Sequence, residues 1–279
     1  MADDDGAPGG LVSDHDDEPC ELDTSVAHPA RVWNYLLGGK DNFAADRAVA
    51  ENVLEVMPVM GTVARAGRAF LATAVHHLAA EAGVRQFLDI GTGLPTASNT
   101  HEVAQCVAPE SRVVYVDNDP IVLAHARALL TSDPRGATGY IEADVRDTGK
   151  IFREASGLLD FTAPVAVALL AILHFIPDSD DPYAITARLM EAMPSGSFLV
   201  ISHASSDIQA ETVAAGALAY NQHSAVSVHP RTGAQVARFL DGLEIVPPGV
   251  VPLGHWQPGP PSAVSRPGLP TYCALGRKP

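Results

Sequence analysis

The sequence alternates short, strongly apolar segments with helical segments, and this alternation constrains the fold more than any other feature. Residues 112–117, 164–173 and 197–203 are rich in branched and apolar side chains, and stretches with helical spacing lie between such runs. A strand that is apolar along its whole length is buried on both faces of its sheet, and helical connections make neighbouring strands parallel. The sequence therefore predicts an α/β fold, a three-layer sandwich around a mostly parallel sheet.

Seven strands and several helices follow from the same patterns. The expected strands are 85–90, 112–117, 139–143, 164–173, 197–203, 243–247 and 271–276. The expected helices are 30–37, 43–56, 63–82, 96–108, 120–131, 181–193, 207–222 and 231–241. A Pro-rich segment joins the last two strands without a helix, so we expect an antiparallel strand at the C-terminal end of the sheet.

Three parts of the chain differ in composition. Residues 1–24 are rich in Asp, Gly and Pro, which predicts a disordered acidic tail. Residues 25–84 are expected to form a cap of N-terminal helices. Residues 85–279 are expected to form the sheet domain, with a helical insertion at about 205–241.

Charge and composition exclude several kinds of partner. The net charge is −15, and residues 1–24 hold nine acidic residues and no Lys or Arg, which leaves −6 for the rest. Without a basic patch we expect no nucleic-acid partner. No apolar run approaches the roughly 18–20 residues that span a bilayer, and no secretory signal is present, so we expect no membrane association. Three widely spaced cysteines favour a reducing cytoplasm and neither a disulfide framework nor a metal site.

The segment from Phe87 to Thr96 carries the strongest chemical signal. A predicted strand reaches Asp89, a turn with Gly91, Thr92 and Gly93 follows, and a helix is expected from Thr96. Glycines let the backbone approach a ligand closely, and the first turn of a helix offers free N–H groups. We therefore expect a ligand at this turn, with Pro95 in the first turn of the helix.

Two more acidic residues end the next strands. Asp117 lies 24 residues after Gly93 and ends the strand 112–117, where a carboxylate can accept hydrogen bonds from ribose hydroxyls. Its alternative role, capping the helix at Pro120, suits Asp119 better. Asp144 ends the strand 139–143, where an acid can accept a hydrogen bond from the exocyclic amine of adenine.

These three acids at successive strand ends resemble the class I S-adenosylmethionine-dependent methyltransferases, with their Rossmann-like fold. The stretch Ala30–Phe43 (ARVWNYLLGGKDNF) is similar to the N-terminal signature of a bacterial family of such enzymes, formerly a domain of unknown function. The segments 86–96, 112–120, 173–178 and 196–203 match that family in order. One departure is Gly67-Arg68, where the family pattern leads us to expect Asn-Arg.

The resemblance implies S-adenosylmethionine as cofactor and assigns roles to individual residues. The turn from Asp89 to Gly93 would hold the methionine end, Asp117 the ribose with Asn118 beside the adenine, and Asp144-Val145 the adenine edge. The segment from Tyr35 to Asp46, with Asn42, is expected to be a lid over the cofactor, although a helix C-cap and turn would give the same pattern. Arg65 and Arg68 could neutralise the cofactor carboxylate or could be solvated.

The acceptor side is less determined by sequence. His174 follows the strand 164–173 and would lie at the ligand-binding edge of the sheet, where a neutral imidazole could deprotonate or orient a nucleophile. It could equally be a structural histidine. Tyr220, Asn221 and His223 lie in the helical insertion and are the candidate substrate-binding residues.

Three functions stay open at this point. The first is methyl transfer from S-adenosylmethionine to a small-molecule acceptor. The second is a nicotinamide-dependent oxidoreductase, although Gly91-x-Gly93-x-x-Thr96 lacks the third glycine and no Tyr is followed four residues later by Lys. The third is a non-catalytic S-adenosylmethionine-binding regulatory protein. Methylation of DNA is disfavoured, because Ala171–Phe175 contains no Asn/Asp-Pro-Pro-aromatic sequence.

Overall fold

A single mixed sheet organises the chain. The computed structural model describes residues 23–258 and 268–279. The strands are β1 (Gln86–Ile90), β2 (Arg112–Asp117), β3 (Ala137–Glu142), β4 (Ala166–Leu170), β5 (Phe198–Ala204), β6 (Glu244–Ile245), β7 (Val251–Pro252) and β8 (Thr271–Arg277). Their order in the sheet is β3-β2-β1-β4-β5-β8-β6, with β7 also paired to β8. The first five are parallel and β8 is antiparallel to β5, which confirms the predicted fold class.

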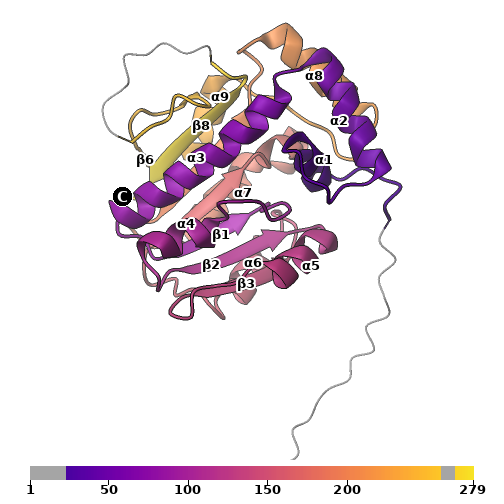
Figure 1. Cartoon of the computed structure of the whole chain (residues 1–279). Helices are drawn as coiled ribbons and strands as arrows, with labels where there is room; N and C mark the ends of the chain where they lie inside the picture. Colours follow the sequence, from indigo (N-terminus) through magenta and orange to yellow (C-terminus); the bar gives the residue numbers. More distant parts are fainter. Residues whose placement is uncertain (1–22, 259–267) are drawn as a thin grey trace, which may run out of the picture.

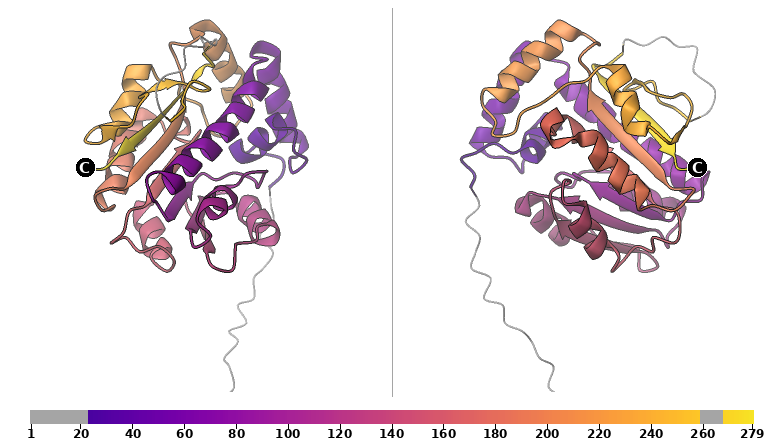
Figure 2. Two further views of the ribbon diagram at one scale, coloured as in Figure 1. Left: turned by 60° about the vertical axis from the view of Figure 1, so that its left-hand side comes forward. Right: turned by 180° about the vertical axis from the view of Figure 1, so that it is seen from behind.

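Helices cover both faces of the sheet (Figures 1 and 2). The helices are α1 (Pro29–Leu36), α2 (Ala44–Val56), α3 (Met60–Ala80), α4 (Thr100–Val107), α5 (Pro120–Leu129), α6 (Thr148–Ala155), α7 (Pro182–Glu191), α8 (Ala210–Asn221) and α9 (Gly233–Ala237). Helices α3 and α4 share a hydrophobic cluster with one face of the sheet. Helices α6, α7 and α9 share another cluster with the opposite face. The two apolar faces therefore form the two cores of a three-layer sandwich.

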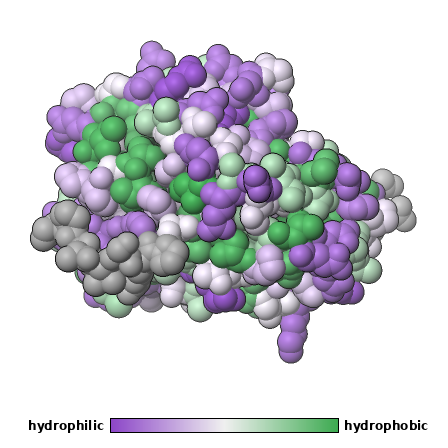
Figure 3. All heavy atoms as spheres, turned by 90° about the horizontal axis from the view of Figure 1, so that it is seen from above, coloured by the Kyte–Doolittle hydropathy of each residue, from purple (hydrophilic) through white to green (hydrophobic). Residues whose placement is uncertain are grey.

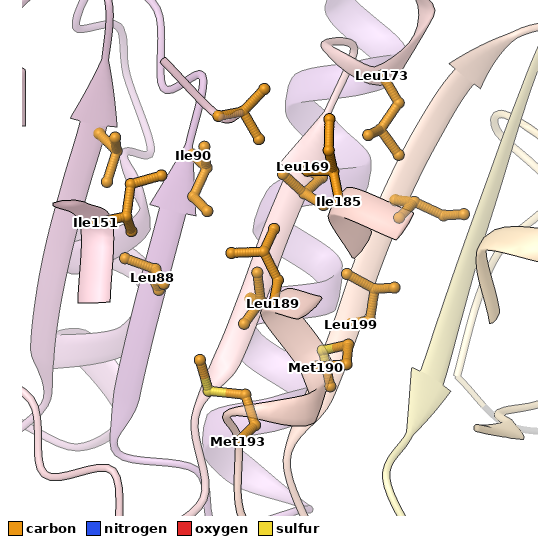
Figure 4. Packing of buried hydrophobic residues seen from close by; sticks show 14 of the residues in the cluster. Leu88, Ile90, Ile151, Leu169, Leu173, Ile185, Leu189, Met190, Met193 and Leu199 are labelled. Carbon is orange, nitrogen blue, oxygen red and sulfur yellow. The ribbon is translucent and has the colours of Figure 1, made fainter. Parts of the chain in front are cut away.

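The core between the sheet and α7 is made of interlocking aliphatic side chains. Ile185 and Leu189 point from α7 toward Leu169 and Leu199 of the two central strands (Figure 4). All four are almost completely buried. Branched side chains at such positions fill the space between layers and fix the position of the helix on the sheet.

The structure differs from the sequence-based expectations in three places, and capping and backbone geometry explain the first two. The helix expected from Thr96 begins at Thr100, because Asn99 and Glu102 form a capping box, so Pro95 is not in its first turn. The strand expected over 164–173 ends at Leu170, because the next residue, Ala171, has a φ of +56° and leaves the extended conformation. The structure also adds α6 and β7, which the sequence patterns did not indicate.

Asp119 caps α5 as expected. Its side chain accepts a hydrogen bond from the Ile121 amide, and Pro120 occupies the first position of the helix. The acidic tail expected over residues 1–24 lies almost entirely outside the described residues. Within the described part of the chain, no helix is long and apolar enough to cross a membrane.

A buried ionic cluster attaches the N-terminal helices to the rest of the fold. Asp46 is completely buried, and its carboxylate accepts hydrogen bonds from the amides of His28 and Phe43. Arg31 lies 3.4 Å from Asp46 and 3.7 Å from Asp119 at the start of α5. This cluster therefore links α1 and α2 to α5 through charges that are removed from water.

We expect Asp46→Asn to lower the free energy of unfolding by about 3 kcal/mol. The substitution leaves the buried Arg31 guanidinium without its nearer counter-charge, and an uncompensated buried charge is strongly destabilising. Equilibrium urea unfolding measures the change. Glu51→Gln is the control, since Glu51 accepts an exposed hydrogen bond from Tyr35 and its loss should change stability little. Equal losses in both variants would contradict a special role for the buried cluster.

Candidate active site

A cavity of about 320 Å³ opens at the carboxyl ends of the parallel strands. Its lining comes from the ends of β1 to β5, from α1 to α3 and from α8. These helices lie together beside the strand ends in Figure 1. Ligands of open α/β sheets bind at this edge, where the chain crosses from one side of the sheet to the other. The cavity therefore lies at the edge of the sheet that ligands occupy in folds of this kind.

The glycine turn after β1 forms one wall of the cavity. Gly91 and Gly93 have φ angles of +72° and +67°, which side chains rarely adopt. A Cβ atom on Gly91 would collide with Ile172 of the loop after β4, whereas a Cβ on Gly93 would meet nothing within 4 Å. Gly91 thus permits close packing of the two loops, while Gly93 borders open space. Thr92 lines the cavity between them.

Asp89 is a buried carboxylate beneath this turn. It accepts a 2.6 Å hydrogen bond from the Thr100 hydroxyl at the start of α4. Burial raises its pKa, and the positive charge of Arg68 opposes that rise. Arg68 donates hydrogen bonds to the Ala97 and Ser98 carbonyl oxygens, while its Nε atom is buried without a partner among the described residues. Asp89 and Arg68 both line the cavity, so one acidic and one positively charged side chain border the space that a ligand would occupy.

Asp117 and Asn118 line the cavity at the end of β2. The Asp117 carboxylate accepts hydrogen bonds from the amides of Gly93 and Asp119, at 2.9 and 3.0 Å. Burial raises the pKa of Asp117, and these two bonds favour its charged form. Each carboxylate oxygen has further acceptor capacity, so Asp117 can fix the glycine turn and still accept hydrogen bonds from a ligand. Asn118 beside it is exposed.

Asp144 and Val145 line the cavity at the end of β3. Val145 is buried, and Asp144 is partly exposed. The Asp144 carboxylate accepts a 2.8 Å hydrogen bond from Arg146, which also forms an ion pair with Asp180. Asp144 is therefore held by Arg146 while it borders the cavity.

His174 reaches the cavity from the short 3₁₀ helix after β4. Burial and the nearby His203 and Arg231 lower its pKa well below its usual range, so the imidazole is neutral. The Ala204 amide donates a long hydrogen bond of 3.5 Å to Nδ1, which favours the tautomer with the proton on Nε2. The backbone of His174 is also held, because its carbonyl oxygen accepts a 2.7 Å bond from the His229 amide.

Arg231 fixes the loop that carries His174. Its guanidinium is buried and donates hydrogen bonds to the carbonyl oxygens of Leu173 and Ile176. It also contacts His203 Nε2 and forms an ion pair with Asp178. Nothing in the sequence patterns indicated this role, because Arg231 lies more than 50 residues along the chain from Leu173, Ile176 and Asp178, and only the fold brings it to them.

Several sequence-predicted residues lie away from the cavity lining. Tyr35 donates a surface hydrogen bond to Glu51, and Arg65 is exposed. Asn42 is buried and donates to Asn34 Oδ1 and to the Gly39 carbonyl oxygen, which stabilises the turn after α1. Of the segment from Tyr35 to Asp46, only Leu36 and Leu37 are among the described residues that line the cavity, and much of the rest forms a helix end and a turn.

The three candidate substrate-binding residues separate in the structure. Tyr220 is buried and lines the cavity. The Asn221 side chain instead exchanges two hydrogen bonds with the backbone of Val228, and His223 is exposed. Neither Asn221 nor His223 is among the described residues that line the cavity.

The sequence did not indicate that a group of apolar residues lines the cavity together. We call it the apolar chamber and define it by twelve apolar or aromatic lining residues from α1 to α3, the loop after β4, α8 and the segment after it: Trp33, Leu36, Val53, Met57, Met60, Val63, Phe175, Val213, Ala217, Tyr220, Val226 and Val228. On the sequence these residues show helical spacing or occur in loops, which is equally typical of ordinary core. Hydrophobic residues are also exposed among hydrophilic ones when the molecule is seen from above (Figure 3).

We expect Asp89→Asn to show an unusual pH dependence of stability. Folding raises the pKa of Asp89 above its ordinary value of 3.8. At pH values below 3.8 the wild-type carboxyl is protonated in both the folded and the unfolded chain and does not lower the free energy of unfolding. As pH rises through the raised pKa, the carboxyl ionises in its buried site and the free energy of unfolding falls. The stability difference between Asp89→Asn and wild type should therefore shift in favour of the variant between pH 4 and pH 7. Urea unfolding at the two pH values measures it.

Asp133→Asn is the matched control. Hydrogen bonds from Arg135 lower the pKa of the partly exposed Asp133, so the favourable contribution of Asp133 to stability is present at neutral pH and lost as pH falls. The control should thus shift in the opposite direction, against the variant at pH 7. The same trend in both variants would show that burial of Asp89 does not control its titration.

Comparison with known proteins identifies the family. Residues 15–279 match the family model of S-adenosyl methyltransferases. A DUF574 family protein from Streptomyces avermitilis is 44% identical with a TM-score of 0.87, over 92% of this chain and 99% of that one. A candidate methyltransferase from Thermobifida fusca is 38% identical with a TM-score of 0.84, over 94% and 98% of the two chains.

More distant structures share the fold alone. The mitomycin 7-O-methyltransferase MmcR is 18% identical with a TM-score of 0.51, over 91% of this chain and 73% of that one. No curated protein matches the chain. The family match, the two similar structures and the strand-end site agree with one another. The chain therefore belongs to the class I S-adenosylmethionine-dependent methyltransferases.

Proposed function

We propose that this protein transfers the methyl group of S-adenosylmethionine to a small-molecule acceptor held in the same cavity. The observation that carries the proposal is the composition of the cavity lining. Acidic side chains and a glycine turn line it at the ends of β1 to β3, and the apolar chamber lines it beside α2 and α8. One cavity thus offers a polar region for the cofactor and a separate region for an acceptor.

Residues of this chain fit the amino-acid end of the cofactor. The buried Arg68 Nε atom has no partner among the described residues, which a cofactor carboxylate would supply. Asp89 would pair with the cofactor ammonium group, and a positive charge beside a buried carboxylate favours its ionised form. The open space at Gly93 lets the backbone approach the ligand.

The other strand ends suit the nucleoside. Asp117 would accept hydrogen bonds from the ribose hydroxyls, and Asn118 and Asp144 would border the adenine, with Val145 against its ring. When bound, the cofactor would supply an electrophilic methyl carbon on its sulfonium; the acceptor would form the new bond to this carbon, the sulfur would keep the electron pair of the broken bond, and the proton of a hydroxyl acceptor would leave to water at the cavity opening. The protein then has to hold the two reactants in line and exclude water.

His174 is the proposed residue at the nucleophile. The tautomer favoured by the Ala204 amide has a proton on Nε2, which suits donation of a hydrogen bond that orients the acceptor. Its lowered pKa makes it a weak base, so orientation is favoured over proton abstraction.

Two features bear on the other functions that the sequence left open. Family membership favours methyl transfer over nicotinamide chemistry. The apolar chamber next to the proposed cofactor site favours an enzyme over a protein that only binds the cofactor. We also propose a cytoplasmic location, in keeping with the free thiols of Cys106 and Cys273.

Calorimetry with S-adenosylhomocysteine tests the cofactor site. We expect Asp117→Asn to bind at least about tenfold more weakly, because hydrogen bonds to a charged group are worth about 1.5–3 kcal/mol each. Asp133→Asn should bind as the wild type does, and NAD should not bind. Binding of NAD in place of S-adenosylhomocysteine would overturn the proposal.

Product formation separates the enzyme from a non-catalytic binding protein. Incubation with S-adenosylmethionine and a panel of small hydroxyl compounds should release S-adenosylhomocysteine, detected by mass spectrometry. The rate should fall in His174→Ala while S-adenosylhomocysteine affinity stays within about twofold. Tight cofactor binding without turnover across the whole panel would favour the regulatory alternative.

A further inference from the structure

We propose that the acceptor is an uncharged, ring-bearing and predominantly apolar molecule that occupies the apolar chamber. This inference rests on the proposed function and names its substrate class. It depends on the charge of the lining, on the small residues of the surrounding helices and on the aromatic walls.

The distribution of charge in the cavity is one-sided. The strongly charged lining residues are Arg68, Asp89, Asp117, Asp144 and Arg146, and they lie on the middle of α3 or at the ends of β1 to β3. Apart from Arg68, none of the described lining residues on α1 to α3, on the loop after β4, on α8 or on the segment after it is Asp, Glu, Lys or Arg. A buried ion without a counter-charge is unfavourable by several kcal/mol. An ammonium, carboxylate or phosphate group in the chamber would therefore have no charged side chain among the twelve residues that define it.

The polar groups at the chamber are neutral. Burial raises the pKa of Tyr220 to about 12, so its hydroxyl keeps its proton. That hydroxyl is buried and forms no hydrogen bond of normal geometry with the described residues. His174, beside the chamber, is neutral as well. Groups of this kind can recognise a hydroxyl or carbonyl on an apolar molecule but cannot balance a charge.

Small residues bring the helices around the chamber close together. Gly216 of α8 packs so closely on α2 that a Cβ atom would lie 2.9 Å from the Met57 sulfur. The next residue, Ala217, lines the cavity with a single methyl group. Gly67 faces the Trp33 ring, and a Cβ there would be 3.6 Å from that ring. The helices thus approach one another through small side chains beside aromatic ones.

Aromatic and flexible side chains complete the walls. The rings of Phe175 and Tyr220 lie 5.9 Å apart at an angle of 42°, and Trp33 lies on α1. Aromatic walls favour aromatic ligands through edge and face contacts. Met57 and Met60 are unbranched and polarizable, so they can adapt to a ring of varied outline. A ring compound fits these walls better than a flexible polar chain.

Three ligands of one shape test the charge requirement. Calorimetry would measure binding of 1-naphthol, 1-naphthoate and 1-naphthylmethylammonium at pH 7 to the full-length protein saturated with S-adenosylhomocysteine. We expect neutral 1-naphthol to bind at least about tenfold more tightly than either ion. Equal or tighter binding of an ion, or no binding of 1-naphthol, would overturn the inference.

A pair of variants on α8 tests the location. Ala217→Phe fills the chamber and should weaken 1-naphthol binding at least about tenfold, with S-adenosylhomocysteine affinity within about twofold of wild type. Ala214→Phe is the matched control, because Ala214 is exposed on the same helix and does not line the cavity. It should leave both ligands unaffected. Unchanged 1-naphthol binding in a folded Ala217→Phe protein would place the ligand elsewhere.

The two proposals fail in different ways. Loss of S-adenosylhomocysteine binding in the wild-type protein would overturn the proposed function itself. Normal S-adenosylhomocysteine binding with preference for a charged naphthalene would overturn only the acceptor class. If Ala217→Phe fails to fold, the three-ligand comparison on the wild-type protein still decides the question.

Discussion

The site depends on two buried carboxylates at neighbouring strand ends, both of which need hydrogen-bond donors from the surrounding loops. Asp89 and Asp117 are removed from water, and each needs hydrogen-bond donors to remain there. The Thr100 hydroxyl satisfies Asp89, and the amides of Gly93 and Asp119 satisfy Asp117. These bonds fix the glycine turn and the starts of α4 and α5. The same carboxylates that organise these loops are thus the ones available to a cofactor.

The N-terminal helices α1 to α3 line the cavity opposite the strand ends. They are attached through the buried charges of Arg31, Asp46 and Asp119, so the cover of the cavity is joined to the end of β2. Their apolar faces then serve two purposes. Part of each face packs against its neighbours in a hydrophobic cluster with α8, and part lines the cavity. An apolar surface that is only partly filled by protein is what a ligand chamber requires.

Local sequence signals predicted some features well and others poorly. Asp119 before Pro120 is a complete helix-start signal within two residues, and the structure shows that cap. The start of α4 was placed four residues too early, because Pro95 outweighed the capping pair Asn99 and Glu102 in the pattern. The segment from Tyr35 to Asp46, which we expected to be a lid, shows a related limit. The polar residues after α1 bond to one another, so a segment rich in functional groups serves mainly as a turn.

The sequence by itself determined the layer architecture, the acids at the strand ends and the family. Those features depend on periodicity and on residues close together in the chain, where short-range geometry fixes the outcome. Only the tertiary structure decided which polar residues reach the cavity and which serve as structural bonds, as Tyr220 and Asn221 show. It also brought Arg231 to the loop of His174 across 57 residues of chain. The side-chain pattern of a helix does not reveal whether its apolar face meets protein or an open chamber, because the apolar residues recur with the same spacing in both cases.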